Sequence, residues 1–158
     1  RNKVLRLSDA TYGQCSVAAV GVAAHECGHA IQHARGYAPL QFRSALVPVA
    51  NFGSMIAWPL IVLGLFINSQ SSALLINIGI LAFSLAVLFQ LVTLPVEYNA
   101  SGRAVRILAE TGMMQGEEIV ATKKVLNAAA LTYVASAAAA ILQLVRILIL
   151  TGGRRRDD

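Results

Sequence analysis

Three long stretches of the chain are almost entirely apolar, and their lengths suit a lipid bilayer. They cover about residues 45–67, 73–94 and 128–150, and Arg146 is the only charged residue within them. A helix needs roughly 20 apolar residues to cross a hydrocarbon core about 30 Å thick. We therefore expect three membrane-spanning helices. The alternative is three buried helices of a soluble domain, but too little polar sequence is left over to cover them.

The composition agrees with a membrane protein. Of the 158 residues, 56% are hydrophobic and 13% are charged, whereas an ordinary soluble domain carries roughly 25% charged residues. The net charge of +5 lies on short segments that flank the apolar stretches, which is typical of a membrane surface. No basic face with interleaved aromatic residues is present, which argues against a nucleic-acid partner. We expect a mainly α-helical, multi-pass protein of the cell membrane.

The chain begins at Arg1 with residues that resemble the middle of a domain. We interpret it as an N-terminally truncated fragment that forms one domain over residues 1–158. Polar and apolar residues alternate from Lys3 to Leu7, and this alternation predicts a short edge strand. A helix is expected over residues 14–35, closed by Gly36. Its apolar run is too short to cross a bilayer.

The expected helix 14–35 carries an HExxH motif formed by His25, Glu26, Cys27, Gly28 and His29. Residues four positions apart share one helical face, so the two imidazoles can converge on a zinc ion. Glu26 lies beside them, where it can accept a proton from a reacting water molecule. A polar patch on a buried helix is the alternative, but burying these groups without a partner costs free energy. We expect Cys27 to be a small buried side chain.

A catalytic zinc usually takes three protein ligands. His33 continues the series, but ligands at i, i+4 and i+8 extend along about 12 Å of helix, too far for one ion. Glu97 directly follows the second apolar stretch, and two crossings return the chain to the membrane side of the histidines. Pro95 suits a helix start or a kink, and segment 95–127 would carry the third ligand. A boundary carboxylate that faces lipid headgroups is the alternative role. The other acidic candidates are Asp9, Glu110, Glu117, Glu118, Asp157 and Asp158.

The distribution of basic residues predicts the orientation. The loop 68–72 is uncharged, whereas the other flanks of the apolar stretches are basic. Because cytoplasmic flanks carry an excess of Lys and Arg, we expect the loop outside and the HExxH motif on the cytoplasmic side. The basic tail 154–156 contradicts this pattern if the third stretch crosses fully. The basic flanking residues are Arg35, Arg43, Arg103, Arg106, Lys123 and Lys124.

Three segments carry a resemblance that covers essentially the whole chain: NKVLRLSDATYG, HECGHAIQHARGY and LPVEYNASGRA. They resemble the bacterial membrane zinc metallopeptidases of the YugP type, and are more distantly similar to the HtpX and CAAX prenyl protease group. The resemblance implies a zincin-like helix and makes Glu97 the third ligand. It also implies that the strand at Val4 to Leu7 holds extended substrate by edge pairing.

The leading hypothesis is a zinc-dependent membrane endopeptidase with one zinc ion per chain, acting on a peptide or protein substrate, with membrane proteins among the candidates. His25, His29 and Glu97 would bind zinc, and Glu26 would act as general base. An oxyanion donor or a residue that supports the ligands is also needed. The sequence leaves four possibilities for it: His33, Tyr98, Asn99 and Arg103.

Two other functions are consistent with parts of the sequence. An intramembrane protease of the site-two type would use an aspartate, often before glycine, on a later span. No aspartate lies between Asp9 and Asp157, which argues against it. A membrane scaffold or chaperone-like protein could hold a structural zinc, and a fourth protein ligand would favour that hypothesis.

Overall fold

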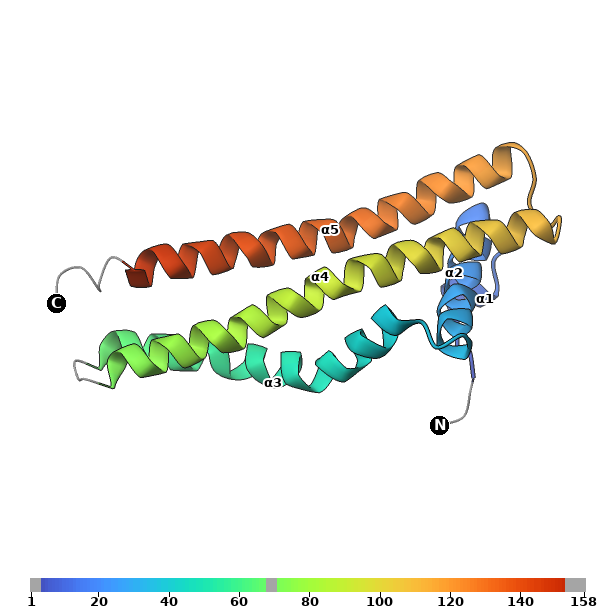
Figure 1. Cartoon of the computed structure of the whole chain (residues 1–158). Helices are drawn as coiled ribbons and strands as arrows, with labels where there is room; N and C mark the ends of the chain where they lie inside the picture. The colour runs from blue at the N-terminus through green and yellow to red at the C-terminus, as the bar shows by residue number, and fades with distance from the viewer. Residues whose placement is uncertain (1–3, 68–70, 153–158) are drawn as a thin grey trace. The chain divides into compact units, whose positions relative to one another are not determined.

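The computed structural model describes residues 4–67 and 71–152, which form five helices (Figure 1). The helices are α1 (Asp9–Tyr12), α2 (Val17–Ala34), α3 (Ala38–Phe66), α4 (Ser72–Glu110) and α5 (Glu117–Gly152). The chain divides into two compact units. The first unit contains residues 1–41 and 93–133, and the second contains residues 42–92 and 134–158. The expected mainly α-helical class is confirmed.

The expected edge strand is not found in the described part of the chain. Residues 4–7 have no regular secondary structure, and Lys3 lies outside the described residues. A strand needs the backbone of a neighbouring strand to complete its hydrogen bonds. All the regular elements within residues 4–67 and 71–152 are helical, so an alternating sequence at this position has no strand beside it.

Helix α2 begins three residues later than expected, because Ser16 caps its N-terminus. The Ser16 hydroxyl accepts a hydrogen bond from the backbone N–H of Ala19, at 3.2 Å. At the other end Gly36 has a φ of +61°, which a residue without Cβ adopts readily. The N–H of Tyr37 donates to the carbonyl of Gln32 at 2.9 Å, closing the last turn. The expectation of a buried Cys27 is wrong, because this side chain is exposed.

The first unit packs α2 against the C-terminal part of α4 and the start of α5. Its core cluster consists of Ala24, Ala104, Leu108, Met114 and Leu126. Gly28 lies directly against α4. A Cβ atom at Gly28 would overlap the carbonyl oxygen of Ala100 and lie 3.0 Å from its carbonyl carbon. This close approach places the α2 face that carries the HExxH motif next to α4.

Small residues also bring helices together in the second unit. A Cβ atom at Gly53 of α3 would lie 2.7 Å from the carbonyl oxygen of Ala82 on α4. One at Gly79 of α4 would lie 2.9 Å from the carbonyl oxygen of Ala57 on α3. Such small-residue contacts are typical of helices that pack in membranes, where backbones approach closely.

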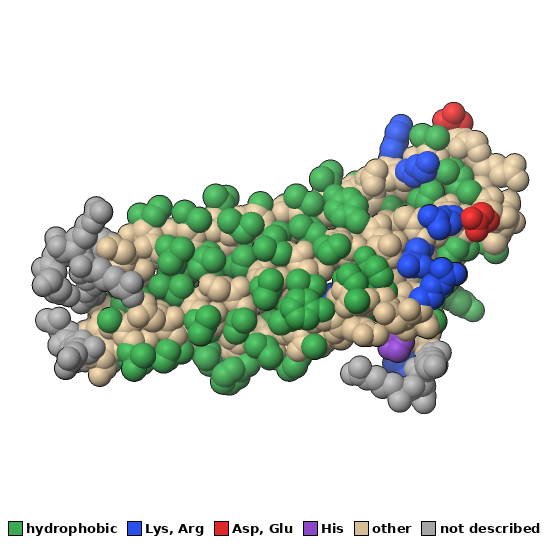
Figure 2. Space-filling view, viewed as in Figure 1, with side chains coloured by type: hydrophobic (Ala, Val, Ile, Leu, Met, Phe, Trp, Pro, Cys, Tyr) green, Lys and Arg blue, Asp and Glu red, His purple; other side chains and the backbone are tan. Residues whose placement is uncertain are grey.

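Three of the described helices, α3, α4 and α5, are long and apolar enough to cross a membrane. The expected stretches fall on them, and α4 continues without a break through Pro95 to Glu110. Only 17–28% of their most apolar windows is buried within the chain, so most of this apolar surface faces outward. On the face shown in Figure 2, hydrophobic side chains are spread over the second unit, whereas most of the Lys and Arg side chains in view lie over the first. These features define a membrane protein.

Candidate metal centre

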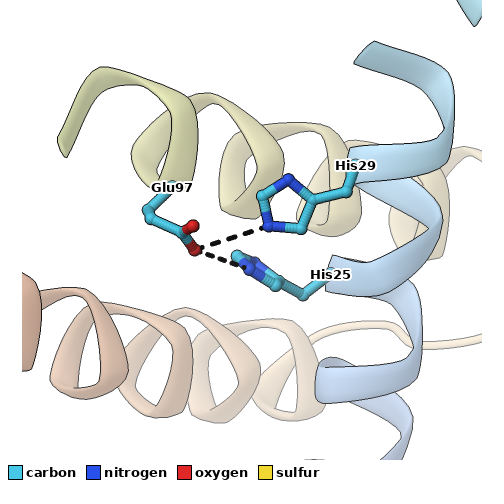
Figure 3. Close-up of side chains that lie close together, drawn as sticks. All are labelled: His25, His29 and Glu97. Atoms are coloured by element: carbon cyan, nitrogen blue, oxygen red, sulfur yellow. Dashed lines mark hydrogen bonds and ion pairs between the residues drawn. The ribbon is translucent and has the colours of Figure 1, made fainter. Parts of the chain in front are cut away.

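Two elements of the first unit bring the candidate site together. His25 and His29 lie one helical turn apart on α2, and Glu97 lies on α4. Figure 3 shows both imidazole rings directed toward one carboxylate oxygen of Glu97. The distance from Glu97 Oε2 is 3.1 Å to His25 Nε2 and 3.4 Å to His29 Nε2. The two rings meet edge to face, with their centroids 4.7 Å apart.

The three side chains have the donor set of a zinc site and lie close enough together to share one ion. Zinc binds imidazole nitrogen and carboxylate oxygen at about 2.0–2.2 Å, and tetrahedral bonds of that length separate two ligand atoms by about 3.3 Å. The contacts of 3.1 and 3.4 Å between Glu97 and the histidines match this separation. One ligand atom from each of the three residues lies within 4.8 Å of the others. The residues therefore fit a zinc ion.

The remaining ring nitrogens of both histidines have hydrogen-bond partners. His25 Nδ1 lies 3.0 Å from the hydroxyl of Ser101, and His29 Nδ1 lies 3.0 Å from Oε1 of Gln32. Metal-binding histidines usually donate the N–H of the second nitrogen in this way, which orients the ring. Both Nε2 atoms are then the nitrogens that face Glu97.

The electrostatic environment of His29 is dominated by carboxylates. The hydrogen bond with Glu97 raises the pKa of His29 above its ordinary value of 6.5, and burial of the ring acts in the opposite direction. The charge of Glu26 also contributes to raising this pKa. Glu26 is half-buried and does not belong to the group of His25, His29 and Glu97. Its carboxylate acts on the site through its charge.

The structure separates the other candidate residues from this group. His33 and Tyr98 are exposed, and neither belongs to the group. Asn99 and Arg103 lie one turn apart on α4, and Arg103 Nε donates to Asn99 Oδ1 at 2.7 Å. The other acidic candidates in the described chain (Asp9, Glu110, Glu117 and Glu118) are all exposed and lie outside the group.

Sequence reasoning missed three residues around the site. Gln32 contacts His29, Ser101 contacts His25, and the ring of Tyr37 lies under the guanidinium of Arg103 at 5.9 Å. The sequence does contain a reason to expect Gln32 beside His29. It follows His29 by three positions, so it shares the same helical face. Ser101 follows Glu97 by four positions and shares its face of α4 for the same reason.

The match to known proteins covers almost the whole chain. Residues 1–152 match the family described as "Putative neutral zinc metallopeptidase", and the chain belongs to this family. It is similar to the protein named "Putative membrane protease YugP" from Bacillus subtilis (strain 168). The two are 45% identical over 153 residues, which is 96% of this chain and 67% of that protein. No solved structure matches the chain.

Proposed function

We propose that the chain is a zinc-dependent membrane endopeptidase with one zinc ion held by His25, His29 and Glu97. One observation carries the proposal: a single carboxylate oxygen of Glu97 lies 3.1 and 3.4 Å from the Nε2 atoms of the two histidines. Membership of a zinc metallopeptidase family and the name of the related membrane protease support it.

The number of ligands favours a catalytic site over a structural one. Structural zinc sites usually have four protein ligands, whereas catalytic sites have three and leave one position for water or substrate. Within residues 4–67 and 71–152, no fourth His, Cys, Asp or Glu joins the group. The exposed Cys27 and His33 lie close in sequence but outside it. This observation argues against a scaffold that holds a structural zinc.

Glu26 is the general base in the proposed reaction. Zinc, when bound, polarises the carbonyl of the scissile peptide bond and makes water more acidic. Glu26 accepts the proton from the attacking water molecule, and it then donates that proton to the amine of the leaving product. A half-buried carboxylate whose charge reaches His29 is suited to this role.

The substrate is a peptide or protein that reaches the site at the cytoplasmic face of the cell membrane. The basic residues of the first unit support this orientation, because cytoplasmic flanks of membrane spans are enriched in Lys and Arg. Several of them are exposed: Arg35, Arg106, Lys123 and Lys124. The three apolar helices would make the protein multi-pass. All four possible oxyanion donors stay candidates: Tyr98 and His33 are exposed, and the bond between Asn99 and Arg103 uses only Nε–H of Arg103 and Oδ1 of Asn99.

The decisive experiment pairs metal analysis with peptide cleavage. The purified chain should contain about one zinc per chain and cleave unstructured peptides at internal bonds. Glu26→Gln keeps the size of the side chain but cannot accept the proton, so zinc content should stay the same. Cleavage should fall by about 100- to 10,000-fold. Undiminished cleavage by this variant, or a wild-type chain that binds no zinc, would contradict the proposal.

A further inference from the structure

The side chain of Gln32 is buried at the centre of a hydrogen-bonded chain beside the candidate metal centre. It is 0% exposed and lies on α2, three positions after His29. Its amide nitrogen donates to the carbonyl oxygen of Val96 at 2.8 Å and to Oδ1 of Asn99 at 3.0 Å. Its amide oxygen faces His29 Nδ1 at 3.0 Å. Both ends of the amide therefore have partners.

These bonds determine which way the amide points. A backbone carbonyl only accepts hydrogen bonds, so the group of Gln32 that faces Val96 must be the NH2 group. The group that faces His29 is then the amide oxygen, which also only accepts. Nδ1 of His29 must carry the hydrogen atom in this contact. In the neutral ring, Nε2 is left with a free lone pair that points toward Glu97.

We propose that Gln32 is a positioning residue that holds His29 in the tautomer required for binding zinc through Nε2. The inference rests on the proposed function, since it assigns Gln32 a task at the same metal centre. Glu97 alone does not select this tautomer, because a carboxylate also accepts a hydrogen bond from a protonated Nε2. Gln32 disfavours the tautomer with the hydrogen atom on Nε2, because its amide oxygen accepts a hydrogen bond only from a protonated Nδ1.

His25 is held in a less selective way. Its Nδ1 faces the Ser101 hydroxyl at 3.0 Å, and a hydroxyl can rotate to donate or to accept. Ser101 therefore stabilises either tautomer of His25. The two histidines differ in this respect, and replacing Gln32 should impair zinc binding more than replacing Ser101.

A second set of contacts fixes Gln32 from outside the site. Asn99 Oδ1 accepts hydrogen bonds from both Gln32 Nε2 and Arg103 Nε, at 3.0 and 2.7 Å. The guanidinium of Arg103 lies over the ring of Tyr37, and the N–H of Tyr37 donates to the carbonyl of Gln32. The contacts therefore form a closed circuit between α4 and the C-terminal end of α2.

The first test measures zinc affinity of the full chain by competition with a chelator. Gln32→Met keeps most of the volume but neither donates nor accepts a strong hydrogen bond, and it should lower affinity about 10- to 100-fold. Ser101→Ala should lower it less. Asn99→Asp should retain near-wild-type affinity, because a carboxylate oxygen still accepts from Gln32 and Arg103. Asn99→Leu should lower affinity, and it tests the same contacts if Gln32→Met does not fold.

A matched control separates positioning from general destabilisation. Thr122 is also 0% exposed. Its hydroxyl donates hydrogen bonds to Met114 and to the carbonyl of Glu118, and neither of these bonds involves a histidine. Thr122→Val should lower thermal stability and leave zinc affinity unchanged. Wild-type zinc affinity in both Gln32→Met and Asn99→Leu would overturn the proposal.

A second readout needs no zinc. Glu97→Ala removes the carboxylate that competes for the proton, and ¹⁵N NMR of the histidines at alkaline pH then reports the tautomer of His29. The Nδ1–H form should predominate in Glu97→Ala and lose its predominance when Gln32→Met is added. Equal tautomer populations in the two chains would overturn the role of Gln32. A wild-type chain without zinc affinity would instead contradict the proposed function.

Discussion

Nε2 of His25 lies 3.1 Å from Oε2 of Glu97, although the two residues are 72 positions apart in the chain. The first prediction concerns this carboxylate. Glu97→Gln retains the shape of the side chain and removes its charge, so zinc affinity should fall by at least about 100-fold, more than for residues that only support ligands. Chelator competition measures the effect. Glu110 is an exposed carboxylate on the same helix, and Glu110→Gln should bind zinc like the wild type. Equal zinc affinities of the wild type, Glu97→Gln and Glu110→Gln would show that Glu97 is not a ligand.

The second prediction tests the packing that brings α2 to α4. A Cβ atom at Gly28 would overlap the Ala100 carbonyl, so Gly28→Ala must push the helices apart. We expect a loss of about 1–3 kcal/mol in the free energy of unfolding, together with weaker zinc binding, because the histidines and Glu97 lie on opposite sides of this contact.

Gly102→Ala is the matched control for Gly28→Ala. Gly102 is also within a helix, but a Cβ atom there would meet nothing within 4 Å. This variant should be stabilised by about 0.4–1 kcal/mol, since alanine reduces the freedom of the unfolded chain. Thermal or denaturant unfolding compares the two variants. Similar effects of both substitutions would show that the close approach at Gly28 is unimportant.

The third prediction concerns pH. The pKa of His29 is raised in the metal-free chain, chiefly by Glu97. The stability that this pair contributes is present below about pH 6.5, the pKa of a histidine in the unfolded chain. It is lost as the pH rises through the higher pKa of His29 in the folded chain. Zinc affinity should change in the opposite direction, because zinc must displace the proton from His29.

Two titrations check the opposing trends. Unfolding of the metal-free chain and chelator competition are each followed across neutral pH. His29→Gln should weaken the pH dependence of metal-free stability, since the raised pKa belongs to this ring. Zinc affinity that increases as the pH falls would contradict the assignment of His29 as a ligand.

The fourth prediction tests orientation in the membrane. Cys15 and Cys27 are both exposed, and we place them on the cytoplasmic side. A maleimide that does not cross membranes should label them only after the membrane is permeabilised. Ser71→Cys, in a chain with Cys15→Ser and Cys27→Ser, should be labelled in intact spheroplasts, because residue 71 would lie outside. Labelling of the native cysteines in intact spheroplasts would show that the first unit lies outside the cell, opposite to the proposed orientation.

Local sequence patterns predicted the helices well, because they depend on neighbouring residues. The apolar lengths indicated three candidate spans, which fall on α3, α4 and α5. The spacing of His25 and His29 put them on one face of a helix, and their Nε2 atoms do face the same carboxylate. Two predictions failed: residues 4–7 form no strand and Cys27 is exposed rather than buried. Strand formation depends on a distant partner that alternation alone cannot supply.

The sequence by itself thus determined the helical class, the apolar spans and the pairing of the two histidines, all of which follow from periodicity and length. The number of expected crossings predicted that Glu97 lies on the same side of the membrane as the histidines, but only the tertiary structure brought its carboxylate within reach of both rings. The contacts of Gln32 with Val96 and Asn99 were likewise decided by tertiary structure. These contacts join residues 64 and 67 positions apart, and their geometry depends on how closely α2 approaches α4 at Gly28.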